Sequence, residues 1–339
     1  MKIKQNFTRA LLICLACCFS SVLSAQDTTA LQTSVDGLVA TALADPSLDL
    51  SDSVAVQAAI DLVMTGAYGL VPTATAAETQ IIAAAVMSAF TVQIQAIPSI
   101  SADAAGSAIA SVASAVVSAA VEASGGDTAM IAAAASGVVQ GAIEATSDDS
   151  AASTTEVITA AASGATSGAI EATAGDDSAD RNAAITAAAS GATSGAVEAT
   201  SSDGDTSAVD AIAAAANGAT TAAVEATSDG DAADTTAAIT AAASGATSGA
   251  IEATSSDGDT SAVDAIAAVT SGATTGATDA GLDSEAAATA VQKAVETTSG
   301  PTGGEGPAET DSNTEDDGPV ITPPEDNDTT IVSPNTPAN

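Results

Sequence analysis

The residues of this sequence with the most evident chemistry are aspartates paired in short segments. Three pairs have the form Asp-Gly-Asp, at 203–205, 229–231 and 257–259, and a glutamate stands four or five residues before each. Carboxylate oxygens two residues apart, with a flexible glycine between them, suit Ca²⁺. The series Asp-x-Asp-x-Asp-Gly and the bidentate glutamate of an EF-hand are absent. A calcium-like site would draw on Glu198, Asp203, Asp205, Glu225, Asp229, Asp231, Glu252, Asp257 and Asp259; helix capping and solubility are the alternative interpretations.

The sequence lacks the residue types that most other catalytic mechanisms require. The 339-residue chain has no histidine, which excludes imidazole bases, histidine-ligated metals and Ser-His-Asp triads. Beyond residue 25 there is no cysteine, and Tyr68 and Phe90 are the only aromatic residues, too few for the aromatic platforms of a carbohydrate cleft. No phosphate-binding loop or nucleophile elbow is present. We therefore predict a protein that is not an enzyme and that needs no cofactor other than, at most, Ca²⁺. An enzyme or ligand binder that uses the N-terminal units is the least favoured alternative.

The charge of the chain restricts its partners. Five basic residues stand against 43 acidic ones, which gives a formal net charge of −38. Such a charge opposes binding to DNA, RNA and anionic membrane surfaces. Self-association, divalent cations and neutral targets remain as partners.

Residues 1–25 have the organisation of a signal peptide. Lys2, Lys4 and Arg9 precede the apolar run 10–19, and small residues follow up to Ala25. The run is short for a transmembrane helix. An uncleaved anchor, or acylation at a cysteine of this segment, are the alternatives. We expect export to the periplasm, the cell surface or the medium of a Gram-negative bacterium.

A 27-residue repeat organises residues 124–298. One glycine recurs at this step, as Gly137, Gly164, Gly191, Gly218, Gly245 and Gly272, and an acidic residue follows seven positions after each. Residues 201–207 and 255–261 are predicted to be loops, and their sequences are identical, so the repeat doubles to 54 residues. A duplicated helical hairpin predicts this doubling; a recent duplication without structural meaning is the alternative.

The repeat unit has the features of a helix. Ser207 and Ser261 begin capping boxes with Asp in the Glu position, and Thr75-Ala-Ala-Glu78 is a complete box. Alanine runs such as 213–216 favour helix over strand. Helices of about 20 residues joined by loops of about six imply antiparallel neighbours. We predict an all-α fold: a tandem array of antiparallel, alanine-rich helices.

Two flanking regions differ from the repeats. Residues 26–123 resemble diverged units, with Pro46, Pro72 and Pro98 at a step of 26. Their larger apolar residues predict a core or a cap of the array: Leu62, Val63, Met64, Ile81, Ile82, Val86, Met87, Phe90, Val92 and Ile94. Residues 299–339 hold seven of the ten prolines, nine acidic residues and no basic one, a composition typical of disorder.

Glycine and threonine spacing suggests how the helices are used. Gly164-x-x-x-Gly168 and its repeats predict close helix packing; the alternative is that glycine only weakens each helix, by about 1 kcal/mol. Threonines recur every seven residues, as Thr186, Thr193 and Thr200. An Ala/Thr array resembles the helical antifreeze proteins in composition only, because the threonine spacing differs. We therefore predict a self-associating surface, matrix or adhesive protein, with ice binding as the alternative.

Overall fold

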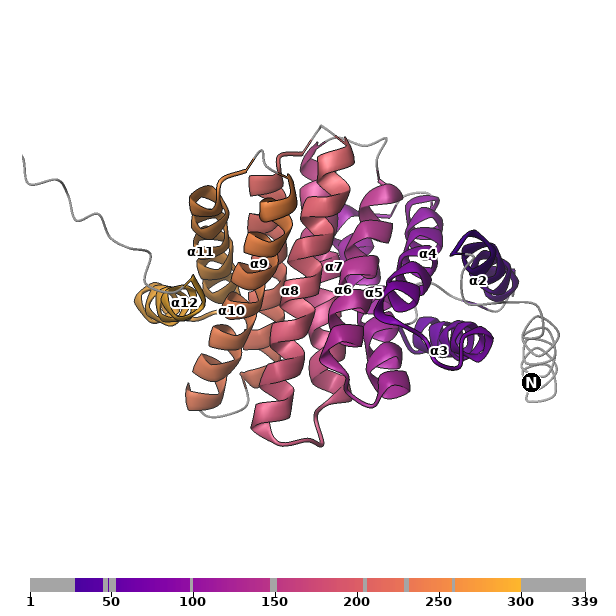
Figure 1. Ribbon diagram of the computed structural model, residues 1–339, viewed down its shortest axis with the longest axis horizontal. Helices are drawn as coiled ribbons and strands as arrows, with labels where there is room; N and C mark the ends of the chain where they lie inside the picture. The colour runs from indigo at the N-terminus through magenta and orange to yellow at the C-terminus, as the bar shows by residue number, and fades with distance from the viewer. Residues whose placement is uncertain are drawn as a thin grey trace, which may run out of the picture. The chain divides into compact units, whose positions relative to one another are not determined.

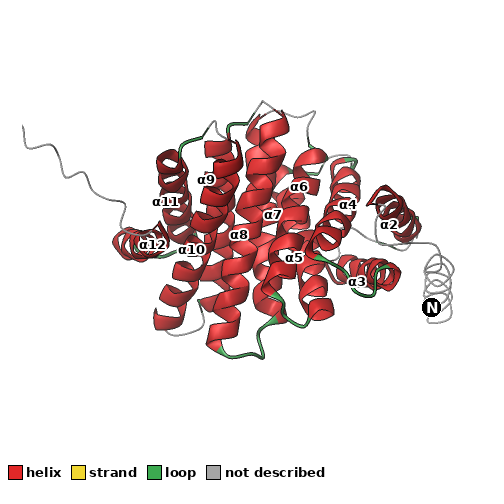
Figure 2. Cartoon of the chain, in the orientation of Figure 1, coloured by secondary structure: helices red, strands yellow, loops and turns green. Residues whose placement is uncertain are grey.

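Helices make up almost all of the computed structural model, which describes residues 28–44, 48, 53–97, 100–146, 151–203, 206–228, 232–257 and 260–299. These residues form eleven helices and no strand (Figure 2). The prediction of an all-α protein is confirmed. The proposed signal peptide and almost all of the acidic C-terminal region lie outside the described residues.

The helices range from 16 to 26 residues. In chain order they are α2 (Thr28–Leu43), α3 (Ser53–Leu70), α4 (Ala76–Gln95), α5 (Ala102–Ser124), α6 (Thr128–Glu144), α7 (Ala151–Ala172), α8 (Ser178–Asp203), α9 (Ala208–Thr227), α10 (Ala232–Asp257), α11 (Ala262–Asp279) and α12 (Ser284–Ser299).

The ends of α8 and α10 correct the predicted loops 201–207 and 255–261. Both helices continue through the first three residues of these segments, to Asp203 and Asp257. The hydroxyl groups of Ser201 and Ser255 donate to backbone carbonyls four residues earlier, at 2.7 and 2.6 Å. Serine therefore satisfies its own hydroxyl within the last turn, and the helix ends only where the sequence reaches glycine.

Several helices begin at the caps that the sequence predicts. The side chain of Thr75 accepts from the backbone N–H of Glu78 at 3.3 Å, and the Glu78 carboxylate accepts from the backbone N–H of Thr75 at 2.8 Å. Ser207 and Ser261 accept from the backbone N–H groups three residues later, both at 3.2 Å. These side chains satisfy N–H groups that have no partner within the helix.

Thr75→Ala should lower the free energy of unfolding by about 1 kcal/mol, because it removes the hydroxyl that accepts from the backbone N–H of Glu78. Thr289→Ala is the matched control, since its exposed hydroxyl bonds only to the carbonyl of Glu285 in its own helix. Denaturant unfolding followed by circular dichroism measures both. Equal effects of the two substitutions would contradict a role for the cap.

The helices form two layers, because each packs most extensively against helices two positions away in the chain. The even-numbered helices α2 to α12 make one layer and the odd-numbered helices α3 to α11 the other (Figure 1). Gly137 and Gly141 of α6 lie against Gln80 and Ala84 of α4. Residue numbers rise together along the two helices, so these neighbours run parallel. The glycine contacts of α7, α8, α10 and α11 show that these helices also run parallel to the preceding helix of their layer.

The core changes in composition along the chain. In the first helices it contains large side chains, and Phe90, Ile60 and Met87 are fully buried. The same cluster continues into α9, where its members are alanines such as Ala215. Val92 was predicted to belong to it but is 47% exposed. It lies four residues after Ser88, on the side of α4 that faces away from the core.

Two helices, α4 and α5, are long and apolar enough to cross a membrane by length and composition. Half of the apolar window in α4, and 44% of that in α5, is buried against other helices of the protein. A buried core helix passes the same test, so these helices assign no location to the protein.

Candidate interaction faces

The solvent-facing stripe of each repeat helix is narrow and consists of small polar residues. On α8 it runs through Thr186, Ser190 and Ser194 to Glu198, at intervals of four residues. On α10 the same positions hold Thr240, Ser244, Ser248 and Glu252. Residues four apart lie on one face of a helix. Each stripe therefore shows neutral hydroxyl-bearing residues along its length and one carboxylate near its C-terminal end.

Glycine lets the parallel helices of a layer approach closely. A Cβ atom at Gly191 of α8 would stand 2.6 Å from the carbonyl carbon of Ala132 in α6, and one at Gly195 would meet Ser136. The glycine carries a hydrogen where the Cβ would be, and that hydrogen faces the carbonyl oxygen. Such Cα–H···O contacts recur at helix–helix interfaces. The packing interpretation of the Gly-x-x-x-Gly pattern is confirmed.

Hydroxyl groups add conventional hydrogen bonds across the same interfaces. Ser194 donates to the carbonyl of Gly249 at 3.2 Å, and Thr186 donates to that of Ala241 at 3.3 Å. In the odd-numbered layer, Thr221 donates to the carbonyl of Gly276 at 3.3 Å. The stripe residues therefore join each helix to the next one of its layer.

The glutamates of the stripes form rows across each layer. Glu144, Glu198 and Glu252 occupy the same place on α6, α8 and α10, and all three are exposed. The amide of Gln140 donates to the Glu198 carboxylate. Neighbouring helix axes lie about 8–10 Å apart. The three carboxylates therefore form an acidic row across the layer.

The structure separates the residues predicted to bind metal. Glu198 and Glu252 lie in the even-numbered layer, whereas Glu225 lies on α9 in the other. The side chains of Asp203 and Asp257 lie outside the described residues, as do Asp205, Asp229, Asp231 and Asp259. Within the described part of the chain, no three carboxylates converge on a point where a metal ion could sit.

The seven-residue threonine spacing places side chains between helices. Thr166, Thr193 and Thr247 are fully buried, while Thr159 and Thr186 are partly exposed. The hydroxyl of Thr193 donates to the carbonyl of Ala189 in its own helix at 2.9 Å. This burial supports the packing interpretation of threonine, because a flat array for ice would need the same residues at the surface.

Tyr68 of α3 carries a buried titratable group. Its phenol oxygen is buried near Thr79, with no hydrogen bond of standard geometry between them. Burial raises the pKa of Tyr68, and the neighbouring Thr79 hydroxyl offsets part of this effect. A neutral phenol in this position is typical of a packing residue.

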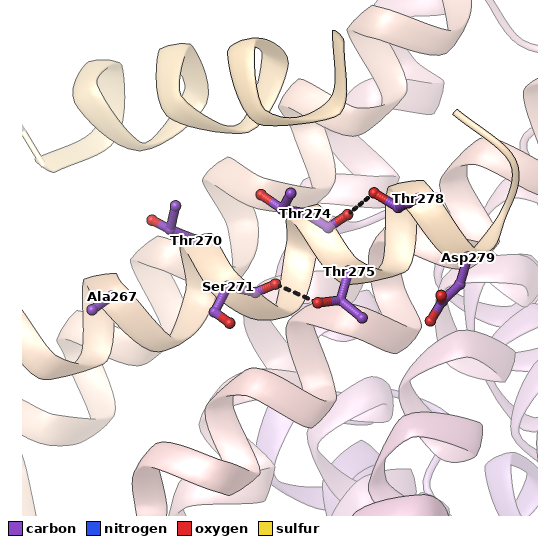
Figure 3. Close-up of a pocket in the computed structure, with 7 residues that line it drawn as sticks. All are labelled: Ala267, Thr270, Ser271, Thr274, Thr275, Thr278 and Asp279. Atoms are coloured by element: carbon purple, nitrogen blue, oxygen red, sulfur yellow. Dashed lines mark hydrogen bonds between the residues drawn. The ribbon is translucent and has the colours of Figure 1, made fainter. Parts of the chain in front are cut away.

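A face on α11 was not singled out from the sequence. Thr270, Thr274 and Thr278 line an open groove together with Ala267, Ser271 and Thr275 (Figure 3). The sequence does distinguish this face, since Thr270 and Thr278 occupy the positions of Ala216 and Val224 in the preceding 54-residue unit. Comparison with known protein families, with curated proteins and with solved structures finds no match to this chain.

Proposed function

We propose that this is an exported, non-enzymatic structural protein that self-associates as a component of a surface, matrix or adhesive material. The observation that carries the proposal is the uniform outer surface of the repeat helices. Stripes of serine, threonine and alanine, each ending in one carboxylate, recur from helix to helix in both layers. A periodic surface of this kind suits contact with another periodic surface better than capture of one small molecule.

The 54-residue duplication supports the architecture on which this depends. Two consecutive 27-residue units make a helical hairpin with one helix in each layer, so each further hairpin extends both layers. Parallel helices in contact within a layer are what such a duplication produces. The result would be an extendable array whose outer stripes keep a constant spacing.

The acidic rows supply the proposed link to divalent cations. Carboxylates repeated on successive helices repel one another and repel the same row on a second copy. A divalent cation that bridges carboxylates of two copies would offset the repulsion within each row and the repulsion between the two rows. Carboxylate oxygens are suitable ligands for Ca²⁺. Export through residues 1–25 would place the protein where calcium is plentiful.

Calcium should therefore raise the mass of the protein in solution. Sedimentation velocity of the chain from Gln26 onward is expected to show larger species with CaCl₂ than with NaCl at equal ionic strength. Glu144→Gln, Glu198→Gln and Glu252→Gln combined should abolish this difference, because they neutralise one row. Asp103→Asn, Asp180→Asn and Glu285→Gln combined are the control, since these exposed acids lie in the first turns of α5, α8 and α12, outside the row, and change the charge equally. A strict monomer at every protein and calcium concentration would contradict the structural role.

A further inference from the structure

The last odd-numbered helix, α11, has one occupied side and one open side. We call the side of a helix that meets the preceding helix of its layer its trailing face, and the opposite side its leading face. The trailing face of α11 carries Gly272 and Gly276, which lie against Ala213 and Asn217 on the leading face of α9. Among the described residues no further helix of this layer follows α11.

The open face repeats a surface that is occupied elsewhere in the same protein. Each residue that lines the α11 groove corresponds, at a step of 54, to one on the leading side of α9. Thr270, Thr274 and Thr278 correspond to Ala216, Thr220 and Val224, which are 0%, 0% and 2% exposed. On α11 the same positions are partly or fully exposed. What differs is that α9 has a successor in its layer and α11 has none.

The chemistry of the open face suits burial. The hydroxyl of Thr270 donates to a carbonyl of α11 itself at 2.8 Å. Those of Thr275 and Thr278 do the same at 2.9 and 2.8 Å (Figure 3). These three hydroxyls are satisfied within their own helix and do not need water. The carboxylate of Asp279, at the C-terminal end of the groove, corresponds to Glu225, which stays exposed on α9 although α11 follows it. On α9, the counterpart Thr221 instead donates to Gly276 of the helix that covers it. Thr275 occupies the equivalent position on α11 and could donate to a backbone carbonyl of a helix that covers this face.

We propose that the leading face of α11 is the docking surface for α3 of a second copy, so that copies join head to tail. The proposal rests on the self-association proposed above and names the surface that performs it. Continuity with the α9–α11 interface argues for a second helix of this chain. Every glycine-bearing trailing face from α6 to α11 already lies against a helix of the same copy. The trailing face of α3 has no such neighbour among the described residues, because α3 is the first described helix of the odd-numbered layer.

The surface of α3 fits this role. Both α3 and α11 have 18 residues. At Gly69 a Cβ would meet nothing within 4 Å, so this glycine is free to contact another backbone. Val54 and Val263 are 75% and 73% exposed, more than any other large hydrophobic residue in the described ranges, and lie in the first turns of α3 and α11. Parallel pairing, the mode used by the glycine contacts within each layer, would bring these two valines together.

The experiment blocks each face separately with arginine. Thr275→Arg blocks the leading face of α11, and Gly69→Arg blocks the trailing face of α3. Ser201→Arg places the same charge at an exposed position on α8, which has neighbours of its own layer on both sides. The buffer contains no calcium, so that no cation bridges the acidic rows. At concentrations where the unmodified chain then forms larger species, each blocked variant alone should sediment as a monomer. Their equimolar mixture should give a dimer and nothing larger, because only one productive pair of faces remains. Ser201→Arg should assemble like the unmodified chain.

The other outcomes overturn the proposal in distinguishable ways. If Thr275→Arg, and Ser271→Glu as a second block of the same face, assemble like the unmodified chain, self-association stands and the docking face is wrong. If Gly69→Arg alone forms dimers while Thr275→Arg does not, two α11 faces pair and the assignment to α3 is wrong. If the unmodified chain is monomeric throughout, the proposed function fails as well. Circular dichroism identifies any variant that has lost its helices.

Discussion

Gly191→Ala is expected to lower the free energy of unfolding by about 1–3 kcal/mol, the usual effect of overpacking a close contact. Alanine is the better helix former by about 1 kcal/mol, so helix propensity alone predicts the opposite sign. The added methyl would stand 2.6 Å from the carbonyl carbon of Ala132 and 2.8 Å from its Cα. Backbone atoms of α6 cannot rotate away as a side chain can, so α6 and α8 would have to separate. Denaturant unfolding followed by circular dichroism gives the change directly.

Gly37→Ala is the control for this prediction. Gly37 lies on the exposed side of α2, and a Cβ there would meet nothing within 4 Å. The same substitution should therefore raise stability by up to about 1 kcal/mol through helix propensity. If Gly191→Ala stabilises the protein as much as Gly37→Ala does, the close packing of α6 and α8 is wrong.

Phe90→Ala should have the largest effect of any single truncation, a loss of about 3–5 kcal/mol. Phe90 is 0% exposed on α4 and is the largest fully buried side chain in the described part of the chain. Its removal would leave a cavity among Met64, Met87 and neighbours, where the protein has its large side chains. The alanine-rich helices farther along have no comparable group to lose. Thermal and denaturant unfolding should both show the loss.

Val92→Ala provides the comparison on the same helix. Val92 is 47% exposed, so its truncation should change the free energy of unfolding by no more than about 0.5 kcal/mol. A similar loss for Phe90→Ala and Val92→Ala would mean that α4 does not place Phe90 in the core.

Local structure could be read from the residues because its causes are local. Thr75 and Glu78 form a capping box through bonds that span three residues, so their types and spacing were sufficient. The glycine pattern likewise predicted a close contact correctly. The predicted loop 201–207 was wrong in its first residues, since Ser201 is as compatible with a helix end as with a loop.

The candidate faces were only partly predictable. The sequence places Glu198, Glu225 and Glu252 four or five residues before the Asp-Gly-Asp segments, and in the structure they lie in the last two turns of α8, α9 and α10. That Glu198 shares a row with Glu144 and Glu252, while Glu225 belongs to the other layer, depends on which helices are neighbours. Threonines such as Thr193 are of a type found on either surface, so their burial followed from the packing alone.

The sequence by itself determined that this protein is helical, where several helices begin, and that glycine would stand at close contacts. Each of these follows from propensities and hydrogen bonds within a few residues of the chain. Only the tertiary structure decided that Gly191 meets Ala132 of the helix two positions earlier, and that the leading face of α11 is left open. The reason is that a 27-residue period repeats the same face on every helix. The residues of a repeated face predict the kind of helix that packs against it. Which helix of the array occupies that place depends on how all the helices pack together.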